Sequence, residues 1–316
     1  MSETRRRSIL TAFTGAALGT GLVGGQAVAA PRTTAATTAA CPTVPVIPAT
    51  RRTPFVTNTD LYRDPQFTEG THYARRYKRQ ARTDADLAAS HPFTRTTVLA
   101  LHGGGIEPGT SEIALGIAGY DPATLAPVVP VPPDGRAVHD YWMFEGLLGT
   151  PTGPGDPSNS DLHVTSTRCD DLVALSMAGG SANVISVHGC NVDQLKQTVP
   201  QGPGIVNPAV DSVLVGGLNA TFKALLIQEL GLAGITAYDG DLVPALAGTD
   251  PDNPCNRGLL RQGAQLELTL GLRKSMFGTF TRPGRPGSTT AKFGHFVNAC
   301  RSAIHQMEQR TDQAHY

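Results

Sequence analysis

Two histidines and one glutamate of this 316-residue chain follow apolar segments in a pattern that suits metal chemistry. The apolar run 97–101 leads into His102, and a short segment with three glycines separates His102 from Glu107. Glycine reaches backbone angles that other residues avoid, so the chain can turn sharply between these two side chains. A second apolar run, 184–187, ends in His188. Two histidines and a glutamate form the ligand set of many catalytic zinc sites, in which water takes the fourth position.

Two other interpretations of these histidines compete with a metal site. A histidine that follows a buried strand is often a hydrogen-bonded structural residue. The His-Gly-Gly-Gly string also builds the oxyanion hole of some lipases and esterases, but those enzymes need a Gly-x-Ser-x-Gly nucleophile elbow between a strand and a helix. The nearest string, Gly179-Gly-Ser-Ala-Asn183, lacks the closing glycine and precedes a strand-like run. The esterase interpretation therefore has no nucleophile.

The elements that must position these side chains alternate in the manner of an α/β fold. Strand-like apolar runs alternate with helical stretches, and the clearest helices are expected over 218–232 and 291–307. About 260 residues follow the N-terminal region, which is enough for one large α/β domain. Two Pro/Gly-rich segments, 120–138 and 150–158, are expected to form long loops. The expected strands are 97–101, 162–167, 184–188, 213–215, 235–238 and 264–270.

Glu267 lies within one of these expected strands, where a charged side chain is costly to bury. A buried carboxylate needs a partner or has a raised pKa, and enzymes tune general bases in this way. The alternative is a surface-facing side chain on an edge strand, because Gln265, Glu267 and Thr269 alternate with leucines. The pattern alone leaves both interpretations open.

Several motifs of the chain together resemble the poly-γ-glutamate hydrolase family. The most specific is His102-Gly-Gly-Gly-Ile-Glu107-Pro-Gly-Thr-Ser-Glu-Ile-Ala114, which is similar to the opening zinc motif of that family. Other motifs appear in the family's order over roughly residues 56–310. They are Tyr141-Trp-Met-Phe-Glu-Gly146, Asn159-Ser-Asp-Leu-His-Val-Thr-Ser-Thr-Arg168, Val184-Ile-Ser-Val-His-Gly189, Val215-Gly-Gly217, Asn253-Pro-Cys-Asn-Arg-Gly258 and Gly263-Ala-Gln-Leu-Glu-Leu268.

The resemblance implies a fold like that of zinc carboxypeptidases, an α/β fold with a mixed central sheet flanked by helices. It also implies Zn²⁺ as the cofactor, held by three ligands: His102, Glu107 and His188. Glu267 is then the catalytic carboxylate, which takes a proton from water and returns it to the leaving nitrogen. We interpret Arg257, assisted by Asn256, as a group that stabilises the oxyanion or binds a substrate carboxylate. The alternative for Arg257 is a salt bridge within its loop.

We therefore expect a secreted zinc-dependent amide-bond hydrolase that cleaves γ-glutamyl bonds. Its substrate would be an anionic γ-glutamyl polymer, poly-γ-glutamate, or a γ-glutamyl peptide. A zinc amidase or peptidase that acts on the γ-D-glutamyl bonds of peptidoglycan would use the same residues and differ in the shape of its cleft. A secreted binding module without activity is the alternative from a different class, but it would be expected to lose a zinc ligand or Glu267, and the chain keeps all four.

The N-terminus has the parts of a bacterial export signal. Residues 1–29 contain Arg5-Arg-Arg7, an Ala/Gly-rich centre and Ala27-Val-Ala29, and the paired arginines before Ser-Ile-Leu indicate the twin-arginine route. The centre is too polar for a transmembrane helix, so the mature protein is expected to be secreted and not to bind membranes. An Ala/Thr/Pro-rich linker is expected over 30–55 and the catalytic domain over 56–312.

The charge balance argues against nucleic acid as a partner. Without residues 1–29 the chain keeps 23 basic and 25 acidic side chains, a formal charge of −2. Nucleic-acid binding needs a strong basic footprint. Five basic residues nonetheless lie between Arg75 and Arg82. Such a run is usually a solvated face, although it could steer a polyanionic substrate.

The five cysteines suit an exported protein, and at least one of them must stay unpaired. We expect a disulfide between Cys169 and Cys190, at neighbouring strand ends, and another between Cys41 and Cys300, which would join the linker to the last helix. Cys255 would remain free.

Overall fold

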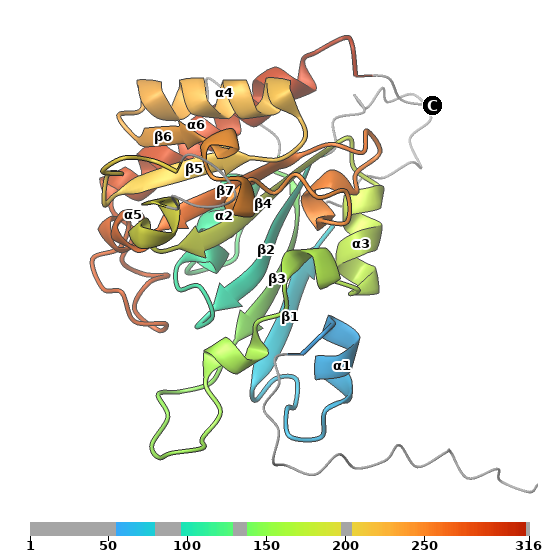
Figure 1. The fold of residues 1–316 in the computed structure, drawn as a ribbon, viewed down its shortest axis with the longest axis vertical. Coiled ribbons are helices and arrows are strands. Elements are labelled where there is room, and N and C mark those ends of the chain that lie inside the picture. Colours follow the sequence, from blue (N-terminus) through green and yellow to red (C-terminus); the bar gives the residue numbers. More distant parts are fainter. Residues whose placement is uncertain (1–54, 80–95, 129–137, 197–203, 314–316) are drawn as a thin grey trace, which may run out of the picture. The chain divides into compact units, whose positions relative to one another are not determined.

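A computed structural model describes residues 55–79, 96–128, 138–196 and 204–313, which belong to a single α/β unit. Its centre is a seven-stranded sheet with the order β1-β3-β2-β4-β7-β5-β6 (Figure 1). Strands β3, β2, β4 and β7 are parallel, β1 is antiparallel to β3, and β5 is antiparallel to β7 and parallel to β6. The expected α/β class with a mixed central sheet flanked by helices is confirmed. The strands are β1 (Tyr73–Lys78), β2 (Thr96–Gly104), β3 (Asp140–Gly146), β4 (Asn183–Cys190), β5 (Ser212–Gly216), β6 (Thr236–Asp239) and β7 (Ala264–Thr269).

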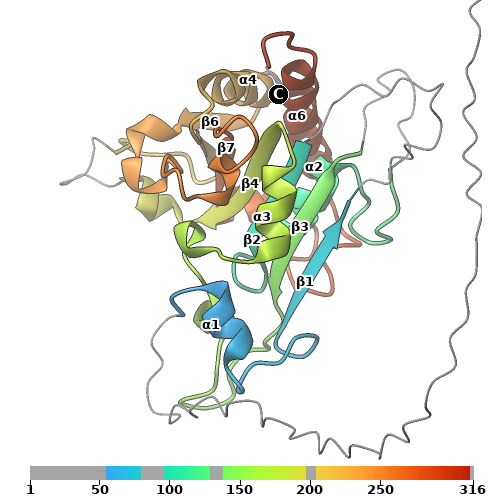
Figure 2. The same ribbon diagram turned by 90° about the vertical axis from the view of Figure 1, so that its right-hand side faces the viewer.

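Helices cover both faces of the sheet (Figures 1 and 2). Alternate strand residues point to opposite faces, so in β2 Val98 and Ala100 pack with α2, α4 and α6, whereas Leu99 and Leu101 pack with α1 and α3. Both faces are covered, so all six residues of β7 and all nine of β2 are buried, polar ones included. The helices are α1 (Asn58–Arg63), α2 (Thr110–Ala118), α3 (Leu172–Gly179), α4 (Ala220–Leu232), α5 (Leu270–Ser275) and α6 (Ala291–Glu308).

The two expected helices correspond to α4 and α6, and each begins at a side-chain cap. The Asn219 side chain accepts a hydrogen bond from the Phe222 amide, and Thr290 accepts one from Phe293. Within the described ranges, no helix has both the length and the hydropathy that a bilayer span requires.

The expected strand 162–167 is wrong, whereas the other five expected strands are present. This segment forms two short 3₁₀ turns, Asn159–Leu162 and Ser166–Arg168. Leu162 and Val164 are buried while Thr165 is exposed. A loop that packs over the core therefore reproduces the alternation that is typical of a strand.

Two strands were not expected from the sequence. β3 is the apolar part of the Tyr141-to-Gly146 motif, and β1 carries most of the basic run at the edge of the sheet. Arg75 forms ion pairs with Glu69 and Asp171, so part of that run is engaged in structural contacts. Arg82 lies outside the described residues.

The expected disulfide between Cys169 and Cys190 is wrong. Cys169, Cys190, Cys255 and Cys300 are all free and buried. Cys169 packs in the cluster beside α3, whereas Cys190 packs in a separate cluster with Leu195, Leu214 and Val243. Cys169 also follows a 3₁₀ turn rather than the expected strand, so the two thiols do not meet at neighbouring strand ends.

Several expectations fall outside the described residues. They are the export signal over 1–29, most of the linker over 30–55, Cys41 with its pairing to Cys300, and part of the loop 120–138.

Candidate metal centre and active site

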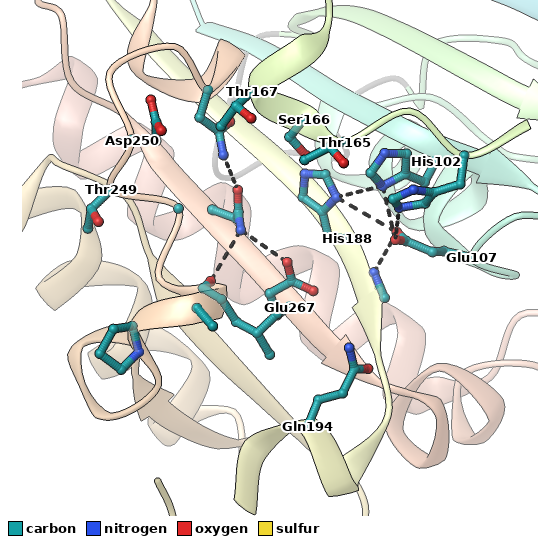
Figure 3. A pocket seen from close by; sticks show the side chains of 18 residues that line it. His102, Glu107, Thr165, Ser166, Thr167, His188, Gln194, Thr249, Asp250 and Glu267 are labelled. Atoms are coloured by element: carbon teal, nitrogen blue, oxygen red, sulfur yellow. Dashed lines mark hydrogen bonds and ion pairs between the residues drawn. The ribbon is translucent and has the colours of Figure 1, made fainter. Parts of the chain in front are cut away.

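The candidate functional side chains gather at the carboxyl ends of the neighbouring strands β2, β4 and β7. His102 comes from β2, His188 from β4 and Glu267 from β7. Parallel strands present their carboxyl ends at one edge, which is the usual position of a ligand crevice in α/β sheets. A cavity of about 460 Å³ opens at this edge, and all three side chains line it together with Glu107 (Figure 3).

His102 reaches the cavity because β2 contains an extra residue. Ala100 pairs with Met143 of β3 and Gly103 pairs with Glu145, so three steps along β2 match two steps along β3. Such a bulge re-aims the side chains beside it. Strict alternation would send His102 to the same face as Ala100, whereas its ring lies 5.0 Å from the His188 ring, centroid to centroid.

The three expected zinc ligands converge. His102 Nδ1 is 3.0 Å from Glu107 Oε1 and 3.1 Å from His188 Nδ1, and His188 Nδ1 is 3.8 Å from Glu107 Oε2. One donor atom from each residue lies within 4.8 Å of the others. The ligands of a four-coordinate zinc ion, at about 2.0–2.2 Å from the metal, stand roughly 3.4 Å apart. The spacing of these donor atoms therefore fits one metal ion.

The protonation of His102 supports the same conclusion. His102 Nε2 lies 2.7 Å from the Val164 carbonyl oxygen, so this nitrogen carries a proton and donates it. Nδ1 of the neutral ring then presents a lone pair to a carboxylate that can only accept. Two acceptors at this distance need a cation between them, either a proton on Nδ1 or a metal ion. A carbonyl that holds the far nitrogen is the usual way to orient a metal-binding imidazole.

The pKa values of the three candidate ligands shift in different directions. Burial lowers the pKa of His188 to about 3, which keeps the imidazole neutral and able to bind a metal. Burial also opposes charge on His102 and Glu107, but their mutual attraction prevails, so the pKa of His102 is raised and that of Glu107 is lowered. The Gly189 amide donates to Glu107 Oε2 at 2.7 Å and holds this carboxylate in place.

Glu267 is buried and faces the cavity, so the edge-strand alternative is wrong. β7 lies between β4 and β5 inside the sheet, and Glu267 is the register partner of His188. Burial and the nearby Glu107 carboxylate raise the pKa of Glu267 well above its ordinary value. Gln265 Nε2 donates to Glu267 Oε1 at 3.0 Å, and Asn253 Nδ2 donates to Gln265 Oε1 at 2.7 Å. Among the described residues only Gln265 donates to this carboxylate, which leaves Oε2 available to the cavity.

A third histidine, His163, lies beside the candidate ligands and was not expected there from the sequence. Its ring stacks on that of His102 with centroids 4.0 Å apart, and its Nε2 is 3.9 Å from Glu107 Oε1. Burial and the neighbouring His102 lower the pKa of His163 to about 4, so this ring is also neutral near pH 7. The only available signal was its position inside the motif that ends at Arg168.

Asn256 and Arg257 do not line the cavity, and the predicted role of Asn256 in substrate binding is corrected. The Asn256 side chain is buried and bonds only to backbone groups of its surroundings. Its Oδ1 accepts from the amides of Leu218 and Gly263, and its Nδ2 donates to the carbonyls of Gly248 and Asp250. These contacts use the hydrogen-bonding capacity of the amide. Arg257 is the C-cap of the 3₁₀ turn Pro254–Asn256, its charge acts on Cys169, and it is absent from the cavity lining among the described residues.

The remaining lining of the cavity is largely polar and carries little charge, with Pro244, Ala245 and Leu246 as an apolar part. Hydroxyl and amide side chains predominate, with one carboxylate, and no lysine or arginine of the described ranges lines the cavity. A substrate group that enters it therefore meets mainly neutral hydrogen-bonding partners. The polar residues of this lining are Thr165, Ser166, Thr167, Gln194, Thr249, Asp250, Asn253 and Gln265.

Comparison with known proteins agrees with the site. A family model described as poly-gamma-glutamate hydrolase matches residues 73–126 and 137–299. The UPF0714 protein YndL of Bacillus subtilis (strain 168) is 32% identical over 216 residues, which cover 68% of this chain and 69% of YndL. The SPbeta prophage-derived UPF0714 protein YoqZ of the same strain is 30% identical over 203 residues, which cover 64% of this chain and 59% of YoqZ.

Two solved structures share the fold. A bacteriophage poly-gamma-glutamate hydrolase superposes with a TM-score of 0.58 and 26% identity, over 80% of this chain and 97% of the other. YndL in its zinc-free form gives the same TM-score and identity, over 80% of this chain and 98% of the other.

Proposed function

This chain belongs to the poly-γ-glutamate hydrolase family, and we propose that it is a zinc-dependent hydrolase that cleaves γ-glutamyl amide bonds in poly-γ-glutamate. One observation carries the proposal. Two histidines and a glutamate converge in a cavity beside a buried carboxylate, Glu267, which forms no direct ion pair within the described part of the chain. The zinc-free form of a related protein supports zinc as the metal.

His102, Glu107 and His188 would hold the ion. Both imidazoles are neutral when they bind a metal, and the carboxylate balances half of the charge of a divalent ion. A zinc ion in such a site supplies Lewis-acid polarisation of a carbonyl group and activation of water. His163 covers one side of His102 and limits the access of bulk water to that ligand.

Glu267 would move the proton. Its Oε2 faces the cavity, whereas Oε1 is held by Gln265, so the carboxylate has one fixed and one available oxygen. A raised pKa makes the Glu267 carboxylate a stronger base, so it accepts a proton from water more readily. In the proposed reaction Glu267 Oε2 accepts a proton from the attacking water. It then returns that proton to the nitrogen that leaves the γ-carbonyl carbon.

The substrate would meet neutral donors in the cavity. A γ-glutamyl residue carries a free carboxylate beside the scissile amide, and the hydroxyls of Ser166 and Thr167 and the Asn253 amide line the same space. Neutral donors bind a carboxylate more weakly than an arginine does, and a long polymer compensates for this by contacts along its length.

We also propose that the protein is exported through the signal over residues 1–29, because this segment combines paired arginines, an Ala/Gly-rich centre and Ala27-Val-Ala29. Mass determination of the protein from a bacterial culture supernatant tests this part. A new N-terminus near Ala30 is expected, and an intact N-terminus inside the cells would refute it.

The decisive experiment measures cleavage of three substrate classes: poly-γ-glutamate, purified peptidoglycan and blocked α-linked peptides. The chain without residues 1–29 is assayed as purified, after chelation, and after zinc is added back. We expect new amino groups to form from poly-γ-glutamate only, with loss on chelation and recovery with zinc. Faster cleavage of peptidoglycan would reassign the substrate. Full activity in the chelated protein would refute the zinc dependence.

A further inference from the structure

A buried arginine lies directly behind the metal centre. Arg273, in α5, is 4% exposed and does not line the cavity. Its guanidinium donates three hydrogen bonds, all to backbone carbonyl oxygens: Nη1 to Pro108 at 2.9 Å, Nη2 to Cys190 at 3.2 Å and Nε to Leu268 at 3.2 Å. Each of these carbonyls belongs to a different segment of the chain.

The three segments are those that carry the site. Pro108 follows Glu107 directly, Leu268 follows Glu267 directly, and Cys190 lies two residues after His188. One planar group with a fixed arrangement of N–H donors thus links the backbone next to two candidate zinc ligands and the candidate general base. Arg273 follows β7 closely in sequence, whereas Pro108 lies 165 residues away and Cys190 lies 83 residues away.

Gly189 of β4 packs directly against the Arg273 guanidinium and leaves no room for a side chain at position 189. A Cβ atom added to Gly189 would lie 2.5 Å from Arg273 Cζ and 2.7 Å from its Nε. Any other residue at 189 would displace the guanidinium. The same Gly189 donates its amide to Glu107, so the glycine contacts the arginine on one side and the ligand on the other.

The charge of Arg273 also acts on the site. Within the described part of the chain, no carboxylate forms a direct ion pair with this guanidinium. Its positive charge lowers the pKa of Glu267, in opposition to burial and to the Glu107 carboxylate. An arginine remains protonated even when buried, so the charge is permanent.

We propose that Arg273 is a positioning residue of the metal centre, which fixes the three backbone segments of Glu107, His188 and Glu267 relative to one another through Gly189 and the three carbonyls. The proposal rests on the proposed function only in that the cluster binds zinc. A role in folding alone would lower the stability of the protein and leave the zinc affinity of the folded molecules unchanged. A positioning role changes zinc affinity and kcat.

The test compares Arg273→Lys, Arg273→Met and Gly189→Ala with the wild type. Lysine keeps the charge and loses the three-way hydrogen bonding, methionine loses both, and alanine at 189 displaces an intact guanidinium. Arg301→Lys is the matched control, because Arg301 also donates to a backbone carbonyl, that of Ile117, at the far end of α2. Zinc affinity is measured on folded protein by competition with a coloured chelator, and kcat and KM are measured with poly-γ-glutamate.

We expect Arg273→Lys and Gly189→Ala to lose about 10- to 100-fold in zinc affinity and in kcat, the range typical for groups that orient metal ligands, with little change in KM. Arg273→Met should lose more, and Arg301→Lys should bind zinc normally. The double variant Gly189→Ala/Arg273→Lys should lose less than the product of the two single effects, because both changes act on one contact.

Wild-type zinc affinity and kcat in folded Arg273→Lys would refute the proposal, even if its Tm were lower. If Arg273→Met does not fold, Arg273→Lys and Gly189→Ala still decide the matter. A wild-type protein that binds zinc but does not cleave γ-glutamyl bonds would refute the proposed function. The zinc affinities of the variants would then decide the role of Arg273.

Discussion

Replacement of Asn256 by alanine should destabilise the protein strongly and leave the chemistry of the remaining folded molecules intact. The side chain is 1% exposed and links four backbone groups: the amides of Leu218 and Gly263 and the carbonyls of Gly248 and Asp250. A buried hydrogen bond contributes about 1 kcal/mol net, so four of them amount to about 4 kcal/mol. For a domain of this size that corresponds to a decrease in Tm of about 8–16 °C.

Arg257→Ala is the matched control for this prediction. The neighbouring side chain is half-buried and has no hydrogen bond to the described residues, so its removal should cost less than about 1 kcal/mol. Urea denaturation at constant zinc concentration gives both free energies of unfolding, and kcat/KM is measured below the unfolding transition. If Asn256→Ala kept wild-type stability but lost kcat/KM, the side chain would be a substrate contact and our interpretation of its hydrogen bonds would be wrong.

Three further results are expected. Glu267→Gln should bind zinc normally and lose about 100- to 10,000-fold in kcat, as measured with poly-γ-glutamate, because the amide cannot accept the proton; near-normal turnover would exclude Glu267 as the base. Zinc at about 1,000 times its Kd should stabilise the protein against unfolding by about 4 kcal/mol relative to the chelated protein. Calorimetry of chelated and reloaded protein can detect this difference, and identical unfolding transitions would contradict zinc binding at this cluster. Burial raises the pKa of Cys255 to about 12, so mass mapping should show slow labelling of Cys255 by a thiol reagent at pH 8 in native protein and rapid labelling after unfolding. Because the folded pKa is raised, this contribution to stability is complete below pH 9 and is lost as the pH rises toward 12, a loss that Cys255→Ser should reduce in alkaline unfolding curves.

The strands that position the site could be predicted because they are buried on both faces. The runs at 97–101, 184–188 and 264–270 are apolar on the face that packs with α4 and α6, and this periodicity is visible in the sequence. β1 was missed because an edge strand tolerates charged residues on its exposed positions, which removes the apolar signal. The loop 162–167 was mistaken for a strand because its alternation reflects packing over the core and not pairing with a neighbour.

The site itself was only partly accessible to sequence reasoning. His102, Glu107 and His188 could be named, because each follows an apolar run or a glycine turn. The residues that hold them could not be named, because their roles depend on tertiary contacts: Arg273 lies 165 residues from the Pro108 carbonyl that it binds. Asn256 was misassigned for the same reason, since a motif shows that a polar residue matters but not whether it faces substrate or backbone.

The arrangement of β4 and β7 explains why the candidate metal ligands and the proposed base, Glu267, belong to one rigid unit. His188 and Glu267 are register partners on adjacent parallel strands, so their backbones stand one strand spacing apart, about 4.8 Å. Their separation cannot change without breaking the centre of the sheet. The walls of the cavity are different, because Thr165–Thr167 and Thr249–Asp250 lie on loops. A change of substrate within this fold would therefore arise in those loops. The distance between the backbones of His188 and Glu267 would stay fixed by the pairing of β4 with β7.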